Sequence, residues 1–129
     1  MKIKILAIAF IFVSTFAISH AEDEKIIYSD EYKERFNTFL TYISDLFLDV
    51  KEYQDEARRA AYDFKFVEYY KLKCKVLNNL EEVLKATEAN LDMPEASEIR
   101  AHTKGLLKTE YEAMEKEEVT KEDLCNGKI

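Results

Sequence analysis

The feature that most restricts the fold of this chain is a long stretch without glycine or proline, from Glu22 to Met93. Tight turns depend on these two residue types, so a sandwich or barrel of many short strands is disfavoured. The stretch is instead rich in Glu, Lys, Ala and Leu, which have high helix propensity. The sequence therefore predicts an all-α protein.

The first part of this stretch carries a strong helical period. Its apolar residues are spaced alternately by three and four positions: Phe36, Phe39, Ile43, Leu46, Val50, Tyr53, Ala57 and Ala60, widened by Leu40, Phe47 and Ala61. A stripe of this width is what a helix needs to face a globular core. Ser29 followed by Asp30 and Glu31 is typical of a capped helix start, so we expect this helix to begin near Asp30.

The length of this first helix conflicts with a small globular domain. Unbroken from Asp30 to Ala60, it would be about 46 Å long, whereas a compact domain of this size has a radius of gyration of about 13 Å. Either the helix breaks, at Asp49 or at the pair Tyr62 and Asp63, or the protein is elongated.

Further helices are expected downstream. A second stripe consists of Phe64, Val67, Tyr70, Cys74, Leu77, Leu80, Leu84 and Leu91, with Val76 and Val83 beside it. Pro94 suits the first turn of a third helix, which carries a thinner apolar face. Thr120 and Asp123 resemble a capping box, with Val119 and Leu124 placed as a hydrophobic staple. We predict a small compact bundle of three to four antiparallel helices plus a short C-terminal helical turn.

The N-terminus has the layout of a secretory signal peptide over residues 1–21. Lys2 and Lys4 precede an apolar run of 14 residues, from Ile5 to Ile18, and Ser19 and Ala21 are small residues at the cleavage positions. Such a run is shorter than the roughly 17–25 residues of a membrane-spanning helix. An uncleaved anchor, a core segment or cleavage after Ala17 are the alternatives. Residues 22–129 are then a single helical domain, secreted and extracellular, with no membrane span after cleavage.

The charge of this mature domain restricts its partners. Without Lys2 and Lys4 it has 17 Lys and Arg against 26 Asp and Glu, a formal charge of −9. An acidic surface repels phosphate backbones and anionic lipid headgroups, so binding to nucleic acid or to a membrane surface is disfavoured.

The two cysteines, Cys74 and Cys125, are predicted to form one structural disulfide, as pairs in secreted domains usually do. If the helix after Pro94 runs antiparallel to the helix that bears Cys74, its end near Glu118 lies beside the start of that helix, and the tail can reach back. An intermolecular link through Cys125 and two free thiols are the alternatives.

Catalytic and metal-binding patterns are missing from the mature sequence. His102 is its only histidine and is expected at the surface, and no serine has the context of a nucleophile. No zinc cluster, calcium loop or glycine-rich phosphate loop can be assembled. We therefore expect no enzyme activity, no cofactor and no metal site.

Two groups of residues are candidates for partner binding. Phe64, Phe66, Tyr69 and Tyr70 cannot all share one helix face, and Tyr62, Phe66 and Tyr69 are the candidates for a partner-binding patch. Core packing or an apolar ligand cavity would also explain such rings. Glu110, Glu115 and Glu118 belong to an acidic C-terminal segment that could dock a basic partner or form a solvated face. A cluster of opposite sign, consisting of Lys65, Lys71, Lys73 and Lys75, is expected to be solvated or paired with that acidic face.

These features favour a secreted extracellular interaction protein, a binder or inhibitor of another macromolecule, of the kind found in saliva, venom or parasite secretions that act on a host protein. The alternative is an extracellular carrier of a lipid or other small hydrophobic ligand within the bundle. The sequence alone does not identify the partner or ligand.

Overall fold

The computed structural model describes residues 29–127 and contains four helices and no strand within this range. They are α2 (Asp30–Tyr62), α3 (Phe66–Glu88), α4 (Pro94–Lys116) and α5 (Lys121–Asn126). The expected all-α bundle with a short C-terminal helix is confirmed. The proposed signal peptide, residues 1–21, lies outside the described residues. None of the helices described is both long and apolar enough to cross a membrane.

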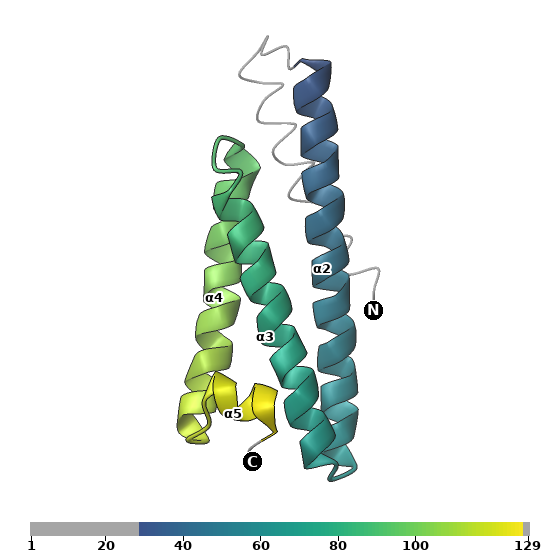
Figure 1. Ribbon diagram of the computed structural model, residues 1–129, viewed down its shortest axis with the longest axis vertical. Helices are drawn as coiled ribbons and strands as arrows, with labels where there is room; N and C mark the ends of the chain where they lie inside the picture. The colour runs from purple at the N-terminus through teal and green to yellow at the C-terminus, as the bar shows by residue number, and fades with distance from the viewer. Residues whose placement is uncertain (1–28, 128–129) are drawn as a thin grey trace.

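Helix α2 runs for 33 residues and ends at Tyr62, so of the two expected break points the pair Tyr62 and Asp63 is the one found, and the unbroken length makes the molecule elongated (Figure 1). Ser29 caps it, accepting a hydrogen bond from the backbone N–H of Tyr32. Its regular apolar stripe faces the bundle along its length, with Phe39, Ile43, Val50, Ala57 and Ala60 buried. Asp49 does not interrupt the apolar stripe, so the helix continues to Tyr62 and is about 50 Å long.

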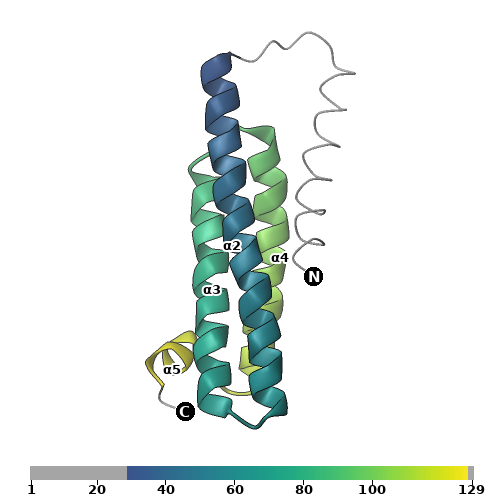
Figure 2. The ribbon, with the colours of Figure 1, turned by 90° about the vertical axis from the view of Figure 1, so that its right-hand side faces the viewer.

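The helices pack as an antiparallel three-helix bundle with α3 in contact with every other helix (Figure 2). The central core contains Val50 of α2, Val76, Leu77 and Leu80 of α3, Leu107 and Met114 of α4, and Leu124 of α5. A second apolar cluster, with Ile43, Val83, Met93 and Ile99, fills the end near the α3–α4 turn. There Arg35 of α2 forms an ion pair with Asp92 at 2.6 Å.

The apolar face of α3 differs from the predicted stripe. Its buried residues are Leu72, Val76, Leu77, Leu80, Val83 and Thr87. Phe64 and Leu91 are exposed because they lie in the turns before and after the helix, where the helical period does not apply. Val67 is helical but lies in the first turn, where no neighbouring helix covers it, and it is exposed too. The expectation that these three residues belong to the core stripe was wrong.

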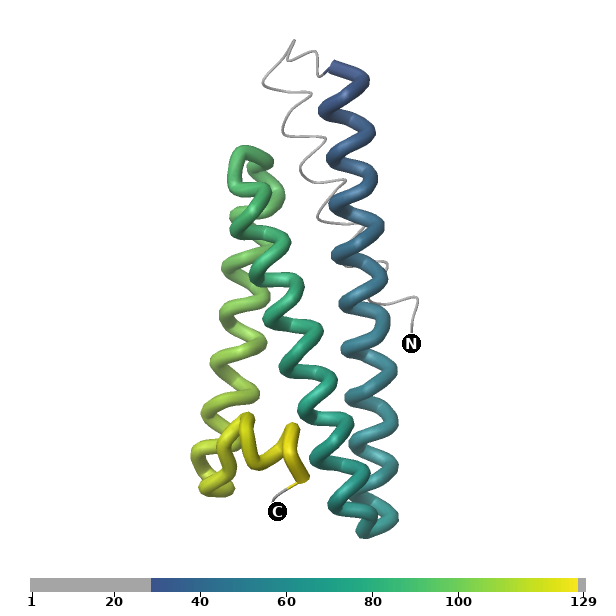
Figure 3. The backbone as a smooth tube through the Cα atoms, viewed as in Figure 1, coloured from purple at the N-terminus to yellow at the C-terminus, as the bar shows by residue number. Residues whose placement is uncertain are grey.

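Helix α5 lies across α3 and is covalently attached to it (Figure 3). Thr120 and Asp123 form the predicted capping box, and Val119 packs on the cluster that buries Leu124. Cys74 and Cys125 form the predicted disulfide, with their Cα atoms 5.1 Å apart. Cys74 is half-buried and Cys125 is exposed, so the tail docks at the edge of the core and not inside it.

A hydrogen-bond cluster on α3 reinforces this attachment. Glu81 accepts hydrogen bonds from the hydroxyl of Tyr111 on α4 and from the ammonium of Lys121 on α5. Burial would raise the pKa of Glu81, but the hydrogen bonds from Lys121 and Tyr111 outweigh it and lower that pKa below its ordinary value. Burial, together with the bond to Glu81, raises the pKa of Tyr111 to about 12. One carboxylate thus joins three helices.

Candidate interaction site

An exposed group of apolar side chains lies at the turn between α2 and α3, at one end of the rod (Figure 1). Tyr62 is 85% exposed, Phe64 77%, Phe66 53% and Val67 63%. We call these four residues the aromatic tip. They expose roughly 500 Å² of side chain, since a large aromatic residue contributes about 150–250 Å² when fully accessible. Large exposed apolar side chains that gather at one place on a monomer often mark an interaction site.

The end of α2 determines how the tip is presented. The backbone N–H of Lys65 donates to the carbonyl of Ala60 at 2.8 Å, and that of Phe64 donates to the carbonyl of Ala61 at 3.1 Å. This pair of hydrogen bonds defines a Schellman motif, in which the residue at the position of Phe64 must adopt a left-handed conformation. Phe64 does so, with φ of 58°.

Phe64 is an unfavourable choice for this position. Glycine is the usual residue there because it has no Cβ to clash with the backbone. A bulky side chain in the left-handed region costs on the order of 1–3 kcal/mol. The exposed ring of Phe64 does not recover this cost through burial in the core. Strain of this kind concentrates at functional sites, so Phe64 becomes a candidate binding residue.

The next residue also departs from local preference. Lys65 is the N-cap of α3 and makes no side-chain capping hydrogen bond. Serine, threonine, aspartate and asparagine are preferred at this position, and a positive charge is unfavourable beside the positive end of the helix dipole. Two adjacent residues of the turn are therefore poor choices for the fold alone.

Shallow hollows flank the tip. The rings of Phe64 and Phe66 meet edge to face, with centroids 6.2 Å apart. Beside them is an open hollow of about 460 Å³, lined by Phe64, Lys65, Phe66, Val67, Glu68 and Lys71. A neighbouring groove of about 510 Å³ runs between α2 and α3. Its cations are Arg59, Lys65, Lys71 and Lys75, and its carboxylates are Glu56, Asp63 and Glu68.

The three rings predicted to bind a partner are placed differently from one another. Tyr62 and Phe66 are on the aromatic tip, whereas Tyr69 is half-buried beneath it. The ring of Tyr69 packs edge to face on that of Tyr70, with centroids 5.2 Å apart. Burial raises the pKa of Tyr69, and the carboxylates of Glu117 and Glu110 raise it further. Tyr69 packs against the apolar cluster of Ala57, Ala60 and Leu72 and shares a hollow with Phe66 of the tip.

The predicted acidic candidates do not form one surface. Glu110 forms an ion pair with Lys73 at 2.6 Å and accepts a hydrogen bond from Gln54, and its side chain is only 13% exposed. The predicted pairing between the lysine cluster and the acidic segment is thus found at Lys73. Glu115 and Glu118 are exposed at the end of α4 and in the turn that follows it. Glu118, with φ of 57°, occupies the same left-handed Schellman position as Phe64.

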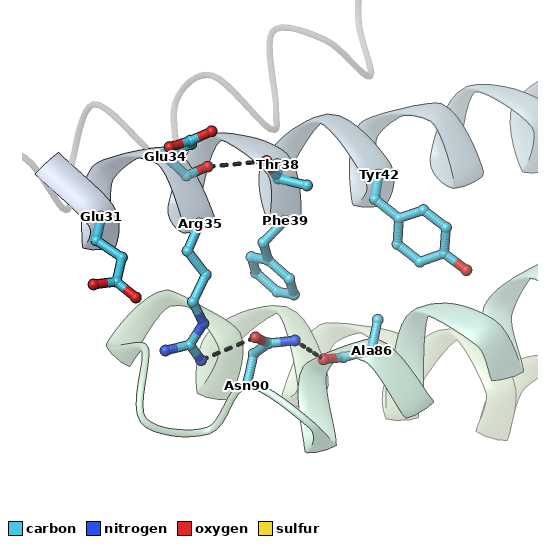
Figure 4. Close-up of a pocket in the computed structure, with 8 residues that line it drawn as sticks. All are labelled: Glu31, Glu34, Arg35, Thr38, Phe39, Tyr42, Ala86 and Asn90. Carbon is cyan, nitrogen blue, oxygen red and sulfur yellow. Dashed lines mark hydrogen bonds between the residues drawn. The ribbon is translucent and has the colours of Figure 1, made fainter.

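A hollow of about 500 Å³ lies between α2 and α3 at the opposite end of the rod (Figure 4). Phe39 points into it from α2, facing Ala86 of α3, and Tyr42 lies one turn further along. Arg35 reaches across to Asn90, with its Nη2 atom 3.0 Å from the amide oxygen. The hollow is mostly apolar and opens to solvent.

Metal binding finds no support in the described part of the chain. Within residues 29–127, no group of three or more His, Cys, Asp or Glu could hold a metal ion. His102 is exposed and lies beside the ring of Phe47, with centroids 6.2 Å apart.

Sequence reasoning missed Phe64 and Val67 as surface residues, because both continue the helical period of α3. The signal that could have revealed them is the alternation of rings and charges from Tyr62 to Phe66, which no single helix face can bury.

No protein-family model matches this chain, and neither curated proteins nor solved structures gave a match. The structure itself therefore gives the class of the protein: a disulfide-linked all-α bundle with an exposed aromatic turn.

Proposed function

We propose that this protein is a secreted extracellular interaction protein that binds another macromolecule through its aromatic tip. The observation that carries the proposal is the exposure of Tyr62, Phe64, Phe66 and Val67 on one turn, with Phe64 in a strained conformation. Tyrosine and phenylalanine are enriched at binding surfaces, where they supply large contact areas at low entropic cost. The proposal assigns no catalytic activity and no cofactor to the chain.

Two features support an extracellular location. The sequence of residues 1–21 has the layout of a signal peptide. The disulfide between Cys74 and Cys125 is a kind of bond that forms and persists in oxidising compartments.

The test is affinity capture with oxidised protein comprising residues 22–129, from the fluid into which it is secreted. Wild type is compared with Phe66→Ala, and Leu91→Ala serves as a matched control because Leu91 is an exposed apolar residue at the other end of the rod. We expect one protein to be captured by wild type and by Leu91→Ala, and its recovery to fall at least about tenfold with Phe66→Ala. Equal recovery with all three, in folded proteins, would remove the tip as the binding site.

A second candidate function is the carriage of a small hydrophobic ligand. The mostly apolar hollow at Phe39, Tyr42 and Ala86 favours it. It predicts a co-purifying ligand in native mass spectrometry and a higher melting temperature with added fatty acid. Apo protein with no thermal shift would count against it. Docking of a basic partner on Glu115 and Glu118 stays a prediction for which the geometry adds no support.

A further inference from the structure

We propose that the partner of the aromatic tip is a protein with an apolar pocket rimmed by carboxylates, into which Phe64 inserts while Lys65 and Lys71 pair with the rim. This inference rests on the proposed function and specifies the chemistry of the partner.

The shape of the tip indicates insertion. The α2–α3 turn is the extreme end of the molecule along its long axis and projects past the ends of α4 and α5 (Figure 1). Phe64 stands in that turn with 77% of its surface exposed. A projecting ring fits a concave site on the partner, and the shallow hollow beside Phe66 then receives the edge of that site.

The backbone identifies Phe64 as the anchor. Glycine at this position would end α2 with the same hydrogen bonds and without strain. The ring makes no contribution to the core, since 77% of Phe64 is exposed, so a contact outside the molecule is the role that we assign to it. Buried aromatic anchors that fill a pocket carry most of the binding energy in protein interfaces.

The charges next to Phe64 indicate an acidic rim. Lys65 occupies a position where it opposes the helix dipole of α3, and it does not cap the helix. In the ion pairs between described residues, Arg59, Lys65 and Lys71 do not take part. The hollow next to the rings and the adjoining groove together have four cations, Arg59, Lys65, Lys71 and Lys75, against three carboxylates, Glu56, Asp63 and Glu68. This surplus of positive charge complements carboxylates, although the chain as a whole is acidic.

A bilayer and a second copy of this chain fit less well. Asp63 and Glu68 stand among the rings, and insertion into a membrane would bring these carboxylates towards hydrocarbon, which is costly. If the tips of two copies met, Lys65 of one molecule would lie near Lys65 of the other, and the two like charges would repel each other.

The first experiment places the photoreactive phenylalanine analogue benzoylphenylalanine at position 64 of oxidised residues 22–129. Irradiation in the secreted fluid is followed by mass spectrometry of the adducts. We expect a cross-link to one protein, at apolar residues that lie within a few residues of Asp or Glu. A lipid adduct, a cross-linked dimer, a protein adduct away from carboxylates, or no adduct would each overturn the inference.

The second experiment separates binding from folding. Phe64→Gly and Lys65→Ser each replace a locally unfavourable residue with a favourable one, so both variants should melt at or above the wild-type temperature. We expect each to reduce recovery of the cross-linked protein at least about tenfold, while Lys65→Arg retains recovery within about threefold. Full recovery with Phe64→Gly or with Lys65→Ser would overturn the inference.

These outcomes are distinct from a failure of the proposed function. If Phe66→Ala abolishes capture but position 64 gives no cross-link, the tip is a binding site and the inserted anchor is wrong. If wild type captures nothing, both are wrong. The last probe is a set of phosphatidylcholine vesicles, prepared with and without phosphatidylserine. If wild type sediments with either kind of vesicle, the tip binds a membrane, and the inference of a protein partner is overturned.

Discussion

Two helices end with a side chain where glycine is usual. Phe64 and Glu118 have φ of 58° and 57°, and each forms the two hydrogen bonds of a Schellman motif. At the end of α4, the residue after Glu118 is Val119, which packs with Met114 in the core as the motif favours. At the end of α2 the equivalent residue is Lys65, which is charged and exposed. The two turns therefore share their backbone strain but differ in how well packing compensates it.

Glycine at either position should stabilise the protein. Phe64→Gly and Glu118→Gly each relieve strain of about 1–3 kcal/mol, partly offset by about 0.5–1 kcal/mol of extra chain entropy in the unfolded state. We expect the free energy of unfolding to rise by about 1 kcal/mol, which corresponds to about 4 °C in melting temperature. Thermal and urea unfolding measure both quantities. A decrease for Phe64→Gly, with an increase for Glu118→Gly, would show that the Phe64 ring stabilises the fold.

Tyr111 should titrate well above the ordinary pKa of a phenol. Because its pKa is raised to about 12 from the ordinary 10.0, its contribution to stability is complete below pH 10 and is lost as the pH rises through about 12. Tyrosinate absorbance of wild type minus that of Tyr111→Phe measures this transition. A difference curve with its midpoint near 10 would show that Tyr111 is neither buried nor bonded to Glu81 in solution as it is in the structure.

Among the elements, α5 is the one that could not exist alone. It has six residues, far fewer than an isolated helix needs in water. Four interactions compensate: the capping box at Thr120, burial of Leu124, the ion pair of Lys121 with Glu81, and the disulfide. Three of these attach it to α3, so its position depends on tertiary contacts.

Removing the disulfide should destabilise the domain. The cross-link joins residues 51 positions apart, for which the chain-entropy relation gives about 4 kcal/mol. We expect the double variant Cys74→Ser with Cys125→Ser to lose roughly that free energy of unfolding and to lose hydrogen-exchange protection first in α5. Wild type with reductant is the control and should behave like the variant. Unchanged stability in both would mean that the noncovalent contacts of α5 suffice.

At the scale of the whole molecule, the long α2 determines the shape. It exceeds α3 and α4 by ten residues each, so its N-terminal turns extend past the α3–α4 turn (Figure 1). The two hollows discussed above, at Phe39 and at Phe66, lie at opposite ends of the rod. Binding at the tip would therefore leave the other end free.

Small-angle scattering should report an elongated monomer. We expect a radius of gyration clearly above the about 13 Å of a compact domain of this length, and a maximum dimension of at least about 50 Å. Oxidised residues 22–129 are the sample, with a dilution series to exclude association. A radius near that of a compact domain would indicate that α2 bends in solution.

The sequence predicted some parts of the molecule better than others. The stripe of α2, the helix start at Ser29, Pro94 in the first turn of α4, the capping box at Thr120 and the disulfide were all readable from local pattern. The face of α3 was only partly correct, since Phe64 and Leu91 continue its period by chance beyond its ends. Of the binding candidates, Tyr62 and Phe66 are exposed, while Tyr69 is half-buried and Glu110 is paired with Lys73 within the fold.

The sequence by itself determined that this protein is helical, where most of its helices begin and which of its cysteines can pair, because these properties depend on neighbours within a few turns and on the number of cysteines. The tertiary structure alone decided that α2 continues unbroken, that Phe64 projects from the end of the rod and that Glu110 pairs with Lys73. Each of these outcomes depends on which surfaces other helices cover, and that is a property of the packed bundle and not of any one segment.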